Sequence, residues 1–81
     1  MNYVQEIADK FLETSDAKTL GPADFTTIAE WEKQEIPKEV VLSSITALSA
    51  EREVRSIADI QEGVKQYFRD WLQVSSSEHV T

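Results

Sequence analysis

Apolar residues recur at the spacing of an α-helix in four stretches of the chain. Near the N-terminus they form one stripe along residues 2–13, opposite a polar face. This stripe consists of Tyr3, Val4, Ile7, Ala8, Phe11 and Leu12. The longest stripe consists of Ile57, Ile60, Val64, Tyr67, Phe68, Trp71 and Leu72. Both patterns predict amphipathic helices. Ser56 and Asp59 fit the capping box that would begin the later one, which should end near Gln73.

Two prolines divide the middle of the chain. Proline suits the first position of a helix, because its missing N–H would have no partner there. Pro22 therefore predicts a helix over residues 22–34. Pro37 predicts the start of another, since the residue before a proline avoids the α region. The helix after Pro37 is apolar over more than half of its circumference, which predicts that it is the central one. Residues 49–55 are interpreted as a charged connection.

These patterns predict an all-α fold, a compact four-helix domain with short loops. Residues 1–74 are expected to form this single domain. Residues 75–81 are polar and serine-rich, and we expect them to be a disordered tail. The chain has only two glycines and two prolines, which is few for an all-β fold with many tight turns. The expected core is Tyr3, Val4, Ile7, Phe11, Phe25, Ile28, Val41, Ile45, Leu48, Ile60, Val64, Phe68 and Trp71.

The charge of the chain narrows the classes of partner. Fifteen acidic residues against eight basic ones give a net charge of −7, which repels phosphate backbones and anionic lipids. We therefore expect no membrane partner, and the charge disfavours nucleic acid. No segment has the pattern of a signal peptide or the length of a transmembrane helix, so a cytoplasmic location is expected. The absence of cysteine excludes disulfides and thiolate zinc sites.

Residue patterns for catalysis or cofactor binding are missing from the sequence. The single histidine, His79, lies in the expected tail, so neither a Ser-His-Asp triad nor a multi-histidine metal site is predicted. Gly21 and Gly63 are isolated and form no phosphate-binding loop. We expect no catalytic residues, no metal and no cofactor, and we interpret the chain as a non-enzymatic domain.

The second predicted helix carries candidate partner-binding residues, Trp31, Glu32 and Glu35. Trp31 lies at the edge of the apolar arc, where it is either a core residue, the favoured interpretation, or a half-exposed anchor for a partner. The acids are interpreted mainly as a solvated face. Glu32 falls inside the apolar arc, so it is either at the rim of the packing or a paired, semi-buried acid.

Half of the eight basic residues lie between positions 52 and 69. Arg52, Arg55, Lys65 and Arg69 are therefore candidates for nucleic-acid binding, and the last two lie one helical turn apart. Ordinary surface charge is the favoured interpretation. The aromatic residues of the same helix fit either a base-stacking platform or, as favoured here, the core.

Between positions 20 and 72, several residues stand in an order known from one protein family. They are Leu20 to Phe25, Ile28 to Glu32, Ile36 to Val41, Ile45, Arg55 to Ile57, and Trp71. This order resembles the helical C-terminal domain of DnaD-type replication proteins. The resemblance implies a small helical fold and a role in DNA replication or in loading replication proteins. Two features of that family are absent: its basic tail, and the tyrosine and aliphatic residue before the last tryptophan, where Gly63 and Tyr67 stand here.

The sequence supports two main hypotheses of function. The first is a small acidic protein-interaction domain, an adaptor or regulator whose partner has a basic or apolar face. The alternative is a DnaD-like, nucleic-acid-binding domain associated with DNA replication. A third, less favoured hypothesis is nucleic-acid mimicry by the acidic surface.

Overall fold

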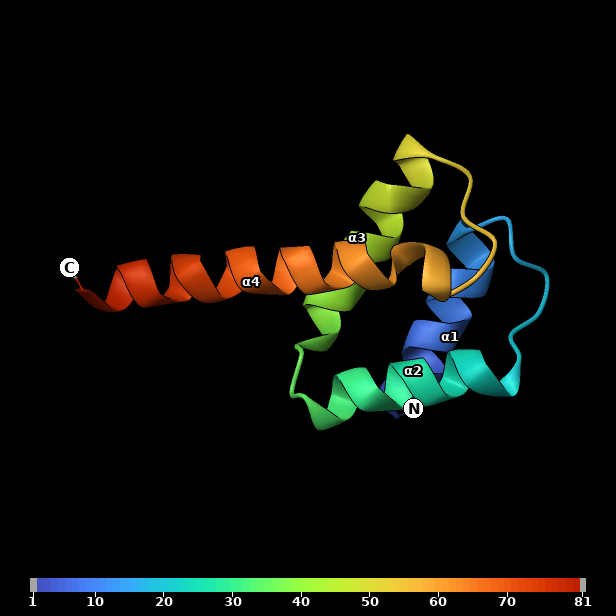
Figure 1. Ribbon diagram of the computed structural model, residues 1–81, viewed down its shortest axis with the longest axis horizontal. Coiled ribbons are helices and arrows are strands. Elements are labelled where there is room, and N and C mark those ends of the chain that lie inside the picture. Colours follow the sequence, from blue (N-terminus) through green and yellow to red (C-terminus); the bar gives the residue numbers. More distant parts are fainter. Residues whose placement is uncertain (1, 81) are drawn as a thin grey trace.

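The structure is a computed structural model that describes the backbone of residues 2–80 and the side chains of residues 2–74. Its helices are α1 (Tyr3–Thr14), α2 (Pro22–Lys33), α3 (Lys38–Glu51) and α4 (Ala58–Val80), and the described backbone contains no strand. α3 packs against both α1 and α4, and α1 also packs against α2 (Figure 1). The predicted all-α fold is confirmed. α1 and α3 each pack against two other helices.

Side-chain oxygens cap the first two helices. The Asn2 Oδ1 atom accepts the backbone N–H of Gln5 at 2.8 Å, which begins α1. At α2, one carboxylate oxygen of Asp24 accepts the N–H of Gly21 at 2.9 Å. Its other oxygen accepts the N–H of Ile57 at 3.3 Å. Asp24 therefore ties the start of α2 to the residue just before α4.

Asp59 fixes the start of α4 in a similar way. Its Oδ2 atom accepts the N–H groups of Arg55 at 3.0 Å and Ser56 at 3.1 Å. The bond from Arg55, with a smaller contribution from Ser56, holds the pKa of Asp59 below its usual value, because it favours the charged carboxylate. The acidic half of the predicted capping box is thus present.

α2 ends in a Schellman motif, one residue before the predicted end. Glu35 adopts a left-handed conformation with φ of 60°, and its N–H donates to the carbonyl of Glu32 at 3.0 Å. The N–H of Ile36 donates to the carbonyl of Trp31 at 3.1 Å. This pattern satisfies the last carbonyls of the helix and brings two apolar side chains together. Trp31 and Ile36 are both only 2% exposed.

The hydrophobic core draws on all four helices and on the connection before α4. Its buried apolar residues are Ile7, Ala8, Phe11, Ile28, Trp31, Ile36, Val40, Val41, Ile45, Leu48, Val54, Ile57, Ile60 and Val64. Of the other predicted core residues, Tyr3, Val4 and Phe68 are partly buried against this cluster. Phe25 and Trp71 are 41% and 40% exposed, so their assignment to the core is wrong.

α4 is the longest helix and continues past the other three (Figure 1). Its apolar stripe predicts an end near Gln73, whereas the helix reaches Val80. The side chains of residues 75–81 lie outside the described part of the chain. The disorder expected for these residues therefore stays a prediction.

Tyr3 joins the start of α1 to the segment after α2. Its hydroxyl donates to the carbonyl of Ile36 at 2.8 Å. Burial, with a smaller contribution from the charge of Glu32, raises the pKa of Tyr3 from 10.0 to about 12. Both causes disfavour the phenolate. The stability that this group contributes is therefore complete below pH 10.0 and is lost as the pH rises through about 12.

We expect Tyr3→Phe to unfold more easily than the native chain at neutral pH, by about 0.5–1.5 kcal/mol for the lost hydrogen bond. The difference between the two proteins should shrink as Tyr3 ionises. Thermal unfolding of both proteins against pH measures this difference. In a Tyr67→Phe background, tyrosinate absorbance follows Tyr3 alone. If the difference in unfolding free energy between the two proteins stayed constant through the alkaline range, the raised pKa of Tyr3 would be contradicted.

Candidate interaction surface

Part of α4 exposes apolar side chains where the helix leaves the core. Val64 is fully buried, and further along the helix the exposed fractions rise to 37% at Tyr67, 40% at Trp71, 44% at Leu72 and 59% at Val74. These four residues are called the α4 apolar surface. The ring of Trp71 stacks on that of the half-buried Phe68, with centroids 6.1 Å apart and planes at 18°. That contact holds Trp71 against the protein while its outer part stays exposed.

A groove of about 410 Å³ lies between this surface and α3. It is called the α3–α4 groove. It is lined by Glu39, Val40 and Ser43 of α3 and by Tyr67, Asp70, Trp71 and Val74 of α4. Val40 is only 6% exposed, whereas the two acids are exposed. The groove thus combines apolar and aromatic side chains with negative charge, and no basic residue lines it.

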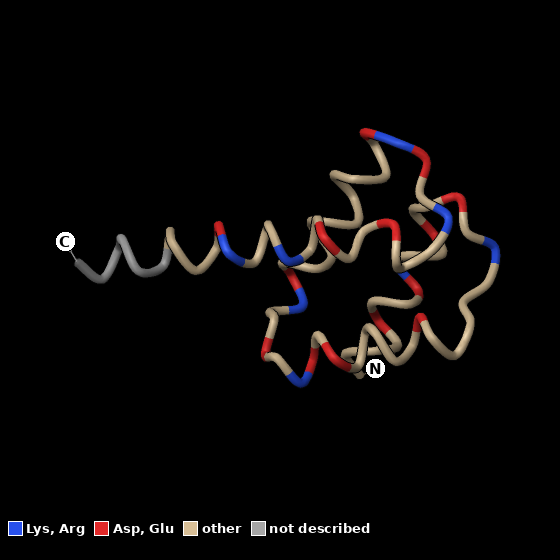
Figure 2. Tube along the Cα trace, viewed as in Figure 1, with Lys and Arg blue, Asp and Glu red and all other residues tan. Residues whose placement is uncertain are grey.

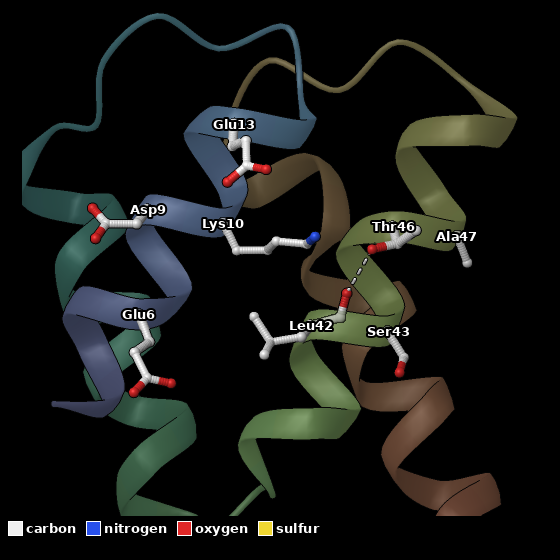
Figure 3. Close-up of a pocket in the computed structure, with 8 residues that line it drawn as sticks. All are labelled: Glu6, Asp9, Lys10, Glu13, Leu42, Ser43, Thr46 and Ala47. Atoms are coloured by element: carbon white, nitrogen blue, oxygen red, sulfur yellow. Dashed lines mark hydrogen bonds between the residues drawn. The ribbon is translucent and has the colours of Figure 1, made fainter. Parts of the chain in front are cut away.

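A larger and more open groove, of about 720 Å³, lies between α1 and α3 (Figure 3). It is called the α1–α3 groove. Three acids of α1 line it, Glu6, Asp9 and Glu13, together with Lys10, whose side chain extends toward α3 (Figure 3). Leu42, Ser43, Thr46 and Ala47 line the other side. Ser43 lines both grooves, so the two lie next to each other on either side of α3.

Two of the three acids of the α1–α3 groove already have structural partners. Glu6 forms an ion pair with Lys38 at the start of α3, and Asp9 accepts a hydrogen bond from the side chain of Gln5 at 2.9 Å. The Thr46 hydroxyl donates to the carbonyl of Leu42 one turn earlier (Figure 3). These contacts are typical of a helix surface and assemble no nucleophile with an adjacent base.

The structure separates the three predicted partner-binding residues. Trp31 is buried in the core, so the hypothesis of an exposed anchor is wrong and the favoured core interpretation is confirmed. Ile36 turns back against it through the Schellman motif, which the helical pattern of α2 alone could not show. Glu32 and Glu35 are exposed, so a semi-buried Glu32 is also wrong. None of the three lines the α1–α3 or the α3–α4 groove.

The four candidate nucleic-acid residues fall on two segments. Arg52 and Arg55 lie in the connection between α3 and α4, where the Arg55 guanidinium is paired with Glu53 at 2.8 Å. Lys65 and Arg69 lie on α4. Acidic and basic positions are mixed along the chain in Figure 2. The basic residues are therefore interspersed with acids that weaken a positive potential.

Among the residues with described side chains, no group of three or more histidine, cysteine or acidic residues is arranged to hold a metal ion. His79 lies outside those residues. Within the described part of the chain, no helix has the combination of length and apolar character needed to cross a membrane.

Helical periodicity predicts that Tyr67 and Trp71 belong to the core, whereas both lie on the α4 apolar surface. Periodicity identifies a stripe on a helix but does not tell what covers it. Length would have been the useful signal. At about 1.5 Å per residue, the stripe from Ile57 to Leu72 spans roughly 22 Å. A helix that crosses it can cover only part of that length.

The described part of the chain is therefore a small helical fold in which the α4 apolar surface lies beside an acid-flanked groove. No family model matches this chain, and no curated protein or solved structure matches it.

Proposed function

We propose that this chain is a non-enzymatic protein-interaction domain that binds another protein through the α4 apolar surface. The observation that carries the proposal is the rise in exposed fraction from Tyr67 to Val74, on the part of α4 that extends past the rest of the fold. Tyr67, Trp71 and Val74 share one face of α4, and such neighbouring apolar side chains in water are unfavourable unless a partner covers them.

The composition of the surface supports this role. Tyrosine and tryptophan are enriched where proteins meet, because they supply a large contact area and lose few rotamers. Trp71 is held by its stacking on Phe68, so binding would need little further ordering of its ring. The net charge of −7 keeps such a protein soluble despite the exposed apolar side chains.

Site-specific photo-crosslinking tests the proposal. A photoreactive residue placed at Val74 should form a discrete adduct with one other protein in the cells that make this chain. The matched control carries a photoreactive phenylalanine at Phe25, an exposed aromatic position on α2. The adduct at position 74 should disappear in the Trp71→Asp variant, provided that circular dichroism shows the variant folded. Adducts of equal yield at both positions, or none at either, would refute the proposal.

The DnaD-like alternative needs its own measurement. With Arg55 paired and acids between the basic residues, we expect no binding of single- or double-stranded DNA, even at low salt. Fluorescence anisotropy of labelled DNA measures this. Binding that weakens steeply with salt and is lost in Lys65→Glu with Arg69→Glu would favour the nucleic-acid function instead.

A further inference from the structure

The α3–α4 groove has the shape features of a site for a helix. Tyr67, Trp71 and Val74 lie four and three residues apart, so they share one face of α4. Val40 and Ser43 of α3 line the opposite wall. α3 crosses α4 next to this groove (Figure 1), so the groove lies in the angle between the two helices. It can take the apolar face of a third helix, whose anchors recur three or four residues apart.

The charges around the groove select the kind of helix. Glu39 and Asp70 flank it from α3 and α4, and both are exposed. The ion pairs found among the described side chains are Lys38 with Glu6 and Arg55 with Glu53, so neither flanking acid is paired in one. Asp70 accepts one hydrogen bond, from the side chain of Gln66 at 3.2 Å. Beyond Ser43, the surface continues to Glu6, Asp9 and Glu13 of the α1–α3 groove. A bound helix would therefore meet apolar groups at its centre and carboxylates at its edges.

From this arrangement we infer that the occupant of the α3–α4 groove is a basic amphipathic helix of another protein, an inference that rests on the proposed function. Its apolar side chains contact Tyr67, Trp71 and Val74, and its lysine or arginine side chains pair with Glu39 and Asp70. Charge complementarity of this kind raises association rates and rejects wrong partners. An acidic helix would place like charges against both rims.

A second copy of this chain is the weaker occupant. Each copy carries a charge of −7. In a two-fold symmetric pair, the same patch of each copy faces the other, so the acids that flank one groove would face the same acids of its partner. Repulsion between the copies opposes such a dimer at low salt.

Isothermal titration calorimetry with three synthetic helical peptides tests the inference. All three carry the same leucine stripe, and their polar faces hold lysine, glutamate or glutamine. We expect the lysine peptide to bind at least tenfold more tightly than the glutamine peptide at low salt, and the glutamate peptide not to bind. Trp71→Ala should lower the affinity for the lysine peptide by about 30-fold, the loss typical of an interface hot spot.

Charge reversal provides the matched comparison. The double variant Glu39→Lys with Asp70→Lys should lower the affinity for the lysine peptide by about tenfold. It should also allow the glutamate peptide to bind. The control, Glu30→Lys with Glu51→Lys, has the same net charge and alters exposed acids that line neither groove. It should leave both affinities nearly unchanged. Equal effects of the two double variants would overturn the inference, because they would show a response to net charge alone.

The outcomes separate this inference from the proposed function. If the three peptides bind equally, or if none binds while the adduct at position 74 still forms with another protein, the charge preference is overturned and the interaction function stands. If the adduct at position 74 joins two copies of this chain and ultracentrifugation shows a dimer, both are overturned.

Discussion

Replacing Trp31 with alanine is expected to cost about 3–5 kcal/mol of unfolding free energy, the range for removing a buried tryptophan. Trp31 is only 2% exposed and contributes the largest of the fully buried side chains. A chain of 81 residues has a total stability of roughly 4–12 kcal/mol. The variant should therefore lose about a quarter of that stability or more. Urea unfolding followed by circular dichroism gives the difference directly.

The second tryptophan supplies the matched control. Trp71→Ala removes the same side chain from a position that is 40% exposed, so we expect a loss of about 1–2 kcal/mol for the area that is buried. In a binding assay the order of the two variants should reverse. Trp71→Ala should bind the partner poorly, whereas the folded fraction of Trp31→Ala should still bind it. Equal loss of stability in the two variants would contradict the assignment of Trp31 to the core and of Trp71 to the surface.

Helix number and most helix ends could be predicted from the sequence because their causes are local. Pro22 fixes the start of α2 by its missing N–H, and the predicted first residue is the observed one. α1 shifts by one residue at each end, from the predicted 2–13 to Tyr3–Thr14. In α1, Asn2 stands just outside the helix as its cap, so the stripe and the cap together define that end.

Residues outside the regular helices were harder to predict because their burial depends on tertiary contacts. Val54 lies between Glu53 and Arg55, and its charged neighbours favoured an exposed connection. It is fully buried, and its carbonyl accepts the N–H of Asp16 at 2.9 Å, which joins the two long connections of the fold. No helical or strand period exists in so short a segment, so the sequence carried no signal for this contact.

The candidate site was mispredicted for a related reason. Trp31 and Trp71 both lie on the apolar arcs of their helices, and the pattern does not distinguish them. Their exposure depends on which parts of the chain pack over them. Ile36 turns back against Trp31, whereas Trp71 lines the open α3–α4 groove and stays 40% exposed. The exposed apolar surface is therefore a property of helix length and packing rather than of residue type.

The close approach of α4 to α3 depends on Gly63, and this gives the second large prediction. A Cβ atom at this position would lie 2.4 Å from the Cδ1 atom of Leu48 and 3.3 Å from its Cγ atom. Leu48 is only 6% exposed, so it has little room to move away. We expect Gly63→Val to lose about 1–3 kcal/mol through overpacking. Gln66→Val, at an exposed position of the same helix, controls for the intrinsic cost of valine in α4. It also removes the hydrogen bond from Gln66 to Asp70, so it should change stability by less than about 1 kcal/mol.

A double-mutant cycle tests whether this contact is the cause. Leu48→Ala alone should cost about 2–5 kcal/mol because it leaves a cavity. In that background, Gly63→Val should raise stability, since its methyl groups occupy the vacated space, and the coupling between the two changes should exceed about 1 kcal/mol. Additive losses would show that the helices do not meet at these residues.

The result also bears on function, because this crossing places Tyr67 and Trp71 of α4 beside Val40 of α3. A folded Gly63→Val protein should therefore bind the lysine peptide more weakly, although residue 63 lies outside the groove.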